Sequence, residues 1–151
     1  MSEEIAYMLA TINRRLATLE RQETPEFQQI VSKSVSHNTN TDIADVTIGN
    51  SGSPIARYLV TLTGASTNTL FADTYLVSQE YNEATVTRLG ALAEFSSRTT
   101  SVALTAAADA ANRKITLTVN QQNTFSEATT VRMTLQVLGV ASGAPVTVAA
   151  V

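Results

Sequence analysis

The 151-residue sequence contains no cysteine, a single histidine and few charged residues. Without cysteine the chain forms no disulfide bonds and no thiolate metal sites, and it has no cysteine nucleophile. Charged residues make up 15% of the chain, against about 25% in an average soluble domain. The surface must therefore be covered largely by Thr, Ser, Asn and Gln, a composition that is common in extended all-β structural proteins.

Basic patches and long apolar runs are also missing. The net charge is −3, and the ten Lys and Arg residues are scattered without interleaved aromatic residues, unlike the basic footprint of a nucleic-acid-binding protein. No run approaches the roughly 18 apolar residues of a transmembrane helix, and the N-terminus is acidic where a signal peptide is basic. We therefore expect no nucleic acid or membrane partner, and a soluble protein that is made in the cytoplasm and is not secreted.

The single histidine and a short run of polar residues are the first candidates for chemistry. A Ser-His-Asp arrangement would have to use His37, which lies in the turn cluster HNTNTD without a G-x-S-x-G context. Asn38, Asn40 and Asp42 alternate like the opening ligands of a calcium loop. The required Gly and Glu are missing from the sixth and twelfth positions of that loop, so we expect no metal site there. For His37 we expect an exposed loop histidine without a catalytic role.

Carboxylate pairs offer a second kind of chemistry. Asp42 with Asp45, or Glu80 with Glu83, could serve glycoside hydrolysis only at a carboxylate separation that the sequence does not give. Both pairs are expected at turns, where acidic residues are normally solvated. Because the chain also has no phosphate-binding glycine motif and no metal-spaced His/Glu helix, we predict that it is not an enzyme and holds no cofactor.

Aromatic residues, which make up 5% of the chain, could form a sugar-binding surface. The candidates are Tyr58, Tyr75, Tyr81 and Phe125. Since Tyr58 and Tyr75 fall on expected strands, core or cross-strand packing is favoured for them.

The most regular pattern of the chain lies in residues 2–23. Apolar residues recur there at steps of four, three, four and three, which is the a/d repeat of a coiled coil: Ile5, Leu9, Ile12, Leu16 and Leu19. Leu occupies the a positions and mostly Ile the d positions, a combination that favours trimers or tetramers over dimers. We expect a trimer. An amphipathic helix that packs on its own β domain is the alternative.

The ends of this segment fit a helix. Ser2 is a plausible N-cap, and Glu3 and Glu4 place carboxylates at the positive end of the helix dipole. Pro25 disfavours helical backbone before it, so the helix should end at about Glu23. Such a helix is about 33 Å long at 1.5 Å per residue.

Two further sets of helix residues predict contacts with other molecules. Arg15 falls at a g position and Glu20 at the following e position, a pair that meets between helices only if they run parallel. Tyr7, Met8 and Arg14 lie on the outer face of the helix. Because Tyr7 and Met8 are larger and more apolar than a solvated face requires, we expect these positions to contact a partner.

After Pro25 the apolar period changes from 3.5 to two, which marks a boundary between a helix (residues 1–24) and a β domain (residues 25–151). Regular alternation and turn signals predict strands at 27–36, 44–48, 55–63, 70–78, 85–95, 102–106, 115–119, 131–137 and 146–150. We expect the strand 55–63 to be central in its sheet. The segment 85–95 also suits a helical turn, but we expect it to be a strand with a bulge at Gly90. Residues 120–127 are expected to form a polar loop. This series predicts an antiparallel β-sandwich or jelly-roll-like domain.

The passage INRRLATLERQETPEF runs from the heptads through a proline into a cysteine-free domain rich in Thr, Ser and Asn. This organisation resembles that of small virion proteins of tailed bacteriophages: capsid decoration or cement proteins, head fibres and short tail fibres. The resemblance implies a homotrimer attached to the virion at one end, with no cofactor and no active site.

Three functions follow from these observations. The first is a homotrimeric capsid decoration or cement protein of a bacteriophage virion, with the major capsid protein as its partner. The second is a short head or tail fibre whose β domain binds a host glycan. The third, from another class, is a carbohydrate-binding or carbohydrate-active module.

Overall fold

In the computed structural model the described residues are 3–23, 28–49, 54–91 and 99–151, and for residues 17–23, 28 and 91 the backbone alone is described. Within them the chain forms one helix, α1 (Glu3–Glu23), and nine strands. The strands are β1 (Gln28–Val35), β2 (Thr41–Ile48), β3 (Ile55–Ala65), β4 (Leu70–Glu80), β5 (Glu83–Ala91), β6 (Thr99–Asp109), β7 (Lys114–Asn123), β8 (Thr129–Val140) and β9 (Val146–Ala150).

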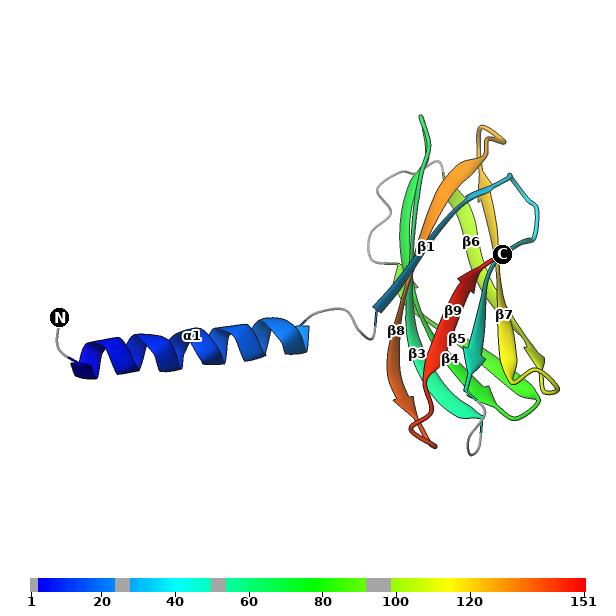
Figure 1. Cartoon of the computed structure of the whole chain (residues 1–151). Coiled ribbons are helices and arrows are strands. Elements are labelled where there is room, and N and C mark those ends of the chain that lie inside the picture. The colour runs from blue at the N-terminus through cyan, green and yellow to red at the C-terminus, as the bar shows by residue number, and fades with distance from the viewer. Residues whose placement is uncertain (1–2, 24–27, 50–53, 92–98) are drawn as a thin grey trace.

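The strands form two antiparallel sheets that pack face to face (Figure 1). One sheet has the order β1-β8-β3-β4-β5 and the other the order β6-β7-β2-β9. In the described part of the chain, β1 and β9 are edge strands, and they lie near each other on one side of the sandwich. The predicted mainly β class and antiparallel sandwich are confirmed.

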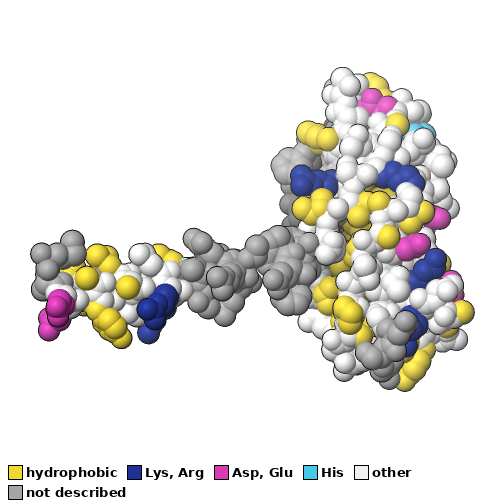
Figure 2. All heavy atoms as spheres, in the orientation of Figure 1, with side chains coloured by type: hydrophobic (Ala, Val, Ile, Leu, Met, Phe, Trp, Pro, Cys, Tyr) yellow, Lys and Arg dark blue, Asp and Glu magenta, His cyan; other side chains and the backbone are white. Residues whose placement is uncertain are grey.

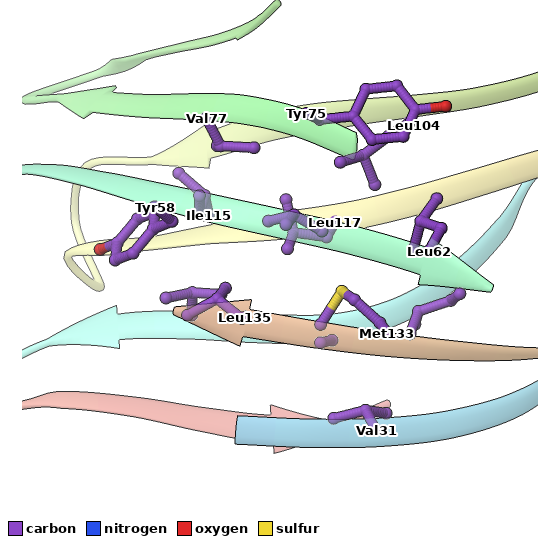
Figure 3. Packing of buried hydrophobic residues seen from close by; sticks show 14 of the residues in the cluster. Val31, Tyr58, Leu62, Tyr75, Val77, Leu104, Ile115, Leu117, Met133 and Leu135 are labelled. Atoms are coloured by element: carbon purple, nitrogen blue, oxygen red, sulfur yellow. The ribbon is translucent and has the colours of Figure 1, made fainter. Parts of the chain in front are cut away.

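The space between the sheets is filled by the inward-facing residues of each strand (Figure 3). On β7, Ile115, Leu117 and Val119 are fully buried, whereas the intervening Thr116 and Thr118 face outward. This period of two is what an antiparallel sheet with one solvated face requires. Each fully buried Leu or Ile contributes about 1.5–3 kcal/mol relative to an exposed one, so these residues dominate the stability of the sandwich.

Strand β3 occupies the central position that the sequence predicted, between β8 and β4. Its Tyr58, Val60 and Leu62 are fully buried between the sheets. Leu59, on the other face, is only half-buried, because the outer face of this sheet is not covered by other described residues.

The prediction of a strand over 85–95 is confirmed as far as Ala91, and residues 92–95 lie outside the described residues. The predicted bulge is also present. Gly90 has a φ of 137°, and the β4–β5 register shifts beside it. Glycine is favoured here because it adopts positive φ without the steric cost of a side chain.

The prediction of a polar loop over 120–127 is wrong in its first half. Strand β7 continues through Asn123, and the side chains of Gln121 and Asn123 are buried. Their amides remain satisfied: Gln121 Nε2 donates to the carbonyl oxygens of Val35 and Glu127, both at 3.0 Å, and Asn123 Nδ2 donates to Gln121 Oε1 at 2.9 Å. Buried amides with these partners are compatible with a strand interior, which polarity alone does not predict.

The predicted helix is observed with bounds close to those expected, Glu3–Glu23, and with Glu3 and Glu4 in its first turn. Ser2 and Pro25 lie outside the described residues. Figure 1 draws α1 apart from the sandwich, and none of its described side chains is buried. Among the described residues, no helix combines the length and apolar character that crossing a membrane requires.

Candidate functional site

An apolar stripe along α1 is the strongest candidate for an interaction site. The exposed fractions of its residues are almost equal: Ile5 50%, Leu9 49%, Ile12 50% and Leu16 51%. A helix that packed along this stripe on its own domain would bury these side chains. The alternative of a helix that covers its own β domain therefore has no support in the single chain.

The other helix residues that the sequence singled out fall into two groups. Tyr7 and Met8 are 75% and 61% exposed, and Arg14 and Arg15 are also exposed. Leu19 and Glu20 lie on the helix backbone, but their side chains are outside the described residues. The predicted pairing of Arg15 with Glu20 of another chain is thus not tested by a single chain, and it remains a prediction.

His37 lies just after β1, and its described contact holds two strands together. The backbone N–H of Asn123 donates to His37 Nδ1 at 3.1 Å, and the residue also forms a bridge to Gln121 of β7. An Nδ1 that accepts a hydrogen bond corresponds to the ring tautomer with its hydrogen on Nε2. This contact gives His37 a structural role at the end of the sandwich.

Asn38, Asn40 and Asp42 do not converge on a common point, as calcium ligands would. Each side chain accepts a hydrogen bond from a different residue of β7: Asn38 from Gln122 at 2.9 Å, Asn40 from Asn120 at 2.8 Å and Asp42 from Thr118 at 2.6 Å. Within the described residues, no group of three or more His, Cys, Asp or Glu side chains could hold a metal ion.

Asp45 extends this row of side-chain pairs. It accepts hydrogen bonds from Thr116 Oγ1 at 2.7 Å and from Lys114 Nζ at 3.3 Å. Five successive outward side chains of β7 thus donate hydrogen bonds to side chains of β2 or of the residues just before it. We call this row of β7 residues the polar ladder: Lys114, Thr116, Thr118, Asn120 and Gln122. The carboxylates of Asp42 and Asp45 are held in this ladder, whereas Glu80 and Glu83 face each other at the exposed end of the β4–β5 hairpin.

The aromatic candidates divide between the core and the surface. Tyr58 and Tyr75 are buried, with Tyr58 Oη donating to Gln79 Oε1 at 3.0 Å and Tyr75 Oη donating to Asp73 Oδ2 at 2.7 Å. Burial raises the pKa of both phenols, and the bond to Asp73 raises that of Tyr75 further. Tyr81 and Phe125 are 57% and 50% exposed. The preference for core packing is confirmed for the two strand residues.

A buried carboxylate that the sequence analysis did not identify lies at the inner face of β4. Asp73 is 1% exposed, and its Oδ2 accepts the Tyr75 hydroxyl and Arg88 Nε, the latter at 2.8 Å. The backbone N–H of Thr74 donates to Oδ1 at 3.1 Å. Three donors around one carboxylate compensate its desolvation, so the cluster joins β4 to β5 as a structural element. Its one sequence signal is an acidic residue at an inward position of a strand.

Glu127 forms a second polar connection that the sequence analysis did not identify. Its Oε1 accepts hydrogen bonds from the hydroxyls of Ser66 and Thr69 and from the backbone N–H of Asn68. These donors, Ser66 first, lower the pKa of the Glu127 carboxyl. The contact ties the β7–β8 connection to the β3–β4 turn across 61 residues of sequence.

Comparisons with known proteins give one distant structural neighbour. No protein-family model matches the chain, and no curated protein is significantly similar to it. The tailspike protein of the Acinetobacter phage vB_ApiP_P1 aligns with 82% of this chain at 14% sequence identity and a TM-score of 0.47. The chain spans about a fifth of the length of that tailspike, 22%. An alignment of this quality assigns neither a family nor a function to the chain.

Proposed function

We propose that the protein is a structural component of a bacteriophage virion, a homotrimer that decorates or cements the capsid. The observation that carries this proposal is the exposed a/d stripe of α1, with Leu9, Ile12 and Leu16 each about half exposed on a helix ahead of a complete sandwich. Three such helices bury the stripe in a parallel coiled coil, and Leu at a with Ile at d favours three or more strands over two.

The parallel arrangement gives each part of the chain a task. The helix (residues 1–24) forms the stem or the shell anchor, and the β domain (residues 25–151) forms the body at one end of it. The mostly uncharged, Thr-rich surface of the sandwich suits a structural protein, and the organisation of the whole chain resembles that of small virion proteins. The major capsid protein is then the partner, and the virion is the location.

Oligomeric state is the first test. Sedimentation equilibrium of the full-length protein at micromolar concentration should give about three times the chain mass of 16.1 kDa. A monomer would contradict the coiled coil.

Location is the second test. Gold-labelled antibody against the protein, applied to purified particles of the phage that carries the gene, should label heads. Label on tails would favour a fibre, and particles without label would contradict a virion role.

A short head or tail fibre with a glycan-binding β domain is the second candidate. One surface favours a glycan-binding role. The side-chain amides of Asn120 and Gln122 in the polar ladder lie close in sequence to Phe125, which is half exposed. Side-chain amides both donate and accept hydrogen bonds, as sugar hydroxyls require, and an aromatic ring beside them offers an apolar face for the sugar ring. A glycan array should then give signals that Phe125→Ala removes and Tyr81→Ala does not.

A further inference from the structure

On one side of the sandwich, two stretches of the chain that adjoin in space carry no charged side chain. Residues 28–32 and 133–151 contain no Asp, Glu, Lys, Arg or His, although a stretch of 24 residues would carry between three and four charges at the 15% of the whole chain. The segments belong to β1, the second half of β8, the following turn and β9. We call their surface the neutral flank.

These segments adjoin in space as well as sharing a composition. Gln28 of β1 pairs with Gln136 of β8, β9 lies near β1, and residues 141–145 connect β8 to β9. In Figure 2 the lower part of the sandwich on the side of the helix shows hydrophobic and neutral side chains, while the Lys, Arg, Asp and Glu side chains lie above it and to its right. The neutral flank is therefore one continuous surface, and two charged residues border it: Arg57 of β3, which lines a groove together with Leu138, and Lys33 of β1, whose Nζ donates to the carbonyl oxygen of Val151.

The neutral flank also exposes apolar side chains. Ile30 is 53% exposed on the outer face of β1, and Leu138 is 52% exposed on β8. Leu138 is the extra residue of a bulge, since Arg57 pairs with Gly139 and Tyr58 with Val137, and the bulge turns it outward. A groove of about 460 Å³, lined by residues 137–140 and 143–146, runs beside it. Leu138 and the mostly apolar lining of this groove form the kind of exposed apolar surface that commonly marks an interaction site.

The connection to the helix places the neutral flank near other copies of the chain. From Glu23, where α1 ends, to Gln28, where β1 begins, there are five Cα steps, which reach at most about 17 Å. Helices in a bundle pack about 8–10 Å apart. In a parallel trimer, the start of each β1 therefore lies within about 25 Å of the common axis, and the three β domains crowd around it with the β1 side closest to the point of attachment.

We propose that the neutral flank is the contact between neighbouring β domains in the trimer, so that its occupant is a second copy of this chain. The inference rests on the proposed trimer. A surface that meets its own copies around an axis brings equal charges together, and each chain carries a net charge of −3. A neutral, partly apolar face avoids that repulsion. The contact would also cover the open edges of β1 and β9, which an isolated sandwich leaves exposed to wrong strand pairing.

Inter-label distances in the full-length protein test this arrangement. Because the chain has no cysteine, Gln136→Cys places a single spin label on the neutral flank, and Thr105→Cys places one on the exposed face of β6 in the other sheet. Pulsed electron resonance should give a shorter distance between labels at 136 than at 105. Equal or reversed distances in a molecule that sediments as a trimer would overturn the flank contact and leave the trimer intact. A monomer would overturn both proposals.

A matched pair of lysine variants gives a second readout. Leu138→Lys adds three charges to the proposed contact, whereas Leu89→Lys changes a leucine of nearly equal exposure, 56%, on β5 at the far edge of the same sheet. Leu138→Lys should raise the concentration at which the trimer is half dissociated by about tenfold or more, and Leu89→Lys by less than about twofold. Equal effects of the two variants would overturn the flank contact. Both side chains are half exposed, so both variants should keep the circular dichroism spectrum of the parent.

Discussion

The ring of Phe71 lies directly against Gly64 across the β3–β4 pair. The two residues are register partners, and a Cβ on Gly64 would overlap Cε1 of the Phe71 ring. Real Cβ atoms essentially never show such an overlap. Phe71 is 6% exposed, and it fills the space that the missing side chain leaves. The sequence GASTN reads as an ordinary turn, yet its first residue is a strand position at which no side chain fits.

Gly64→Ala should therefore destabilise the sandwich. The added methyl group forces the Phe71 ring out of its position, and overpacking of this kind typically costs about 1–3 kcal/mol. Chemical denaturation followed by circular dichroism measures the change. Gly139→Ala is the control, because a Cβ at Gly139 meets nothing within 4 Å. It should change stability by less than about 1 kcal/mol.

The double variant Gly64→Ala/Phe71→Ala adds a sharper test of the same contact. If the clash between the new methyl group and the ring causes the loss, adding Gly64→Ala to a chain that already has Phe71→Ala should cost little. Strict additivity of the two single changes would mean that Gly64 is needed for its backbone alone, since residues in contact normally show a coupling of about 0.5–3 kcal/mol.

Glu127 predicts a loss of stability in acid. Its pKa is lowered in the folded state, chiefly by the Ser66 hydroxyl, from an ordinary value of 4.5. The unfolded chain therefore takes up the proton first as the pH falls. The stabilisation is present above about pH 4.5 and is lost as the pH drops through the folded-state value. Denaturation midpoints measured across this range should fall less for Glu127→Gln than for the parent protein.

Glu83→Gln is the control for this experiment. Glu83 lies at the exposed β4–β5 hairpin, away from Ser66 and the β7–β8 connection. Because Glu83 faces Glu80, its replacement removes a like-charge repulsion, and it should not make the acid dependence shallower as Glu127→Gln does. If Glu127→Gln loses stability in acid as steeply as the parent, other carboxylates determine the acid sensitivity, and the contact to the β3–β4 turn is not the responsible one.

Charge exchange on the helix tests the parallel register. Arg15→Glu places like charges opposite Glu20 of a neighbouring chain and should weaken assembly by a few tenths to about 1 kcal/mol. Adding Glu20→Arg to the same chain should restore assembly, because it re-creates the opposite pair in exchanged form. Concentration-dependent sedimentation measures both effects. A double variant no better than the single one would mean that the helices do not run in parallel.

Strand positions were largely predictable because alternation along one strand is a local signal. The runs around Leu117 and Met133 alternate cleanly, and the buried faces were identified correctly from them. The end of β7 was not predictable in this way. Gln121 and Asn123 are polar, and their burial depends on hydrogen bonds that the local sequence does not reveal. The carbonyl oxygen of Val35, distant in sequence, accepts from Gln121, and the carbonyl oxygen of Glu127 in the β7–β8 connection accepts from both amides.

The candidate surfaces show the same division between local and long-range information. The a/d spacing of Leu9, Ile12 and Leu16 predicted an apolar stripe, and the stripe is exposed. The neutral flank joins segments about 100 residues apart, β1 with β8 and β9, so no window of sequence contains it. Asp73 and Arg88 were missed for the same reason, since a strand register brings them together.

Removal of the helix separates folding from assembly. The described sandwich closes its core without any buried residue of α1. Deletion of residues 1–24 should therefore leave a folded β domain with the parent's β-type circular dichroism spectrum and a cooperative unfolding transition. Loss of that transition would mean that the helix is needed for folding and that the division at residue 24 is wrong.

Particle binding by the truncated protein then distinguishes the roles of the helix. A trimer that engages several symmetry-related sites gains avidity of about 10² to 10⁴ over one subunit without any new contact. Fusion of the truncated domain to an unrelated trimeric coiled coil should restore part of the binding, because trimerisation returns while Tyr7, Met8 and Arg14 stay absent. Full recovery would assign all particle contacts to the β domain, and no recovery would assign them to the exposed helix face. If the truncated monomer binds particles as tightly as the full-length protein, neither trimerisation nor the helix takes part in attachment, and the proposed function fails.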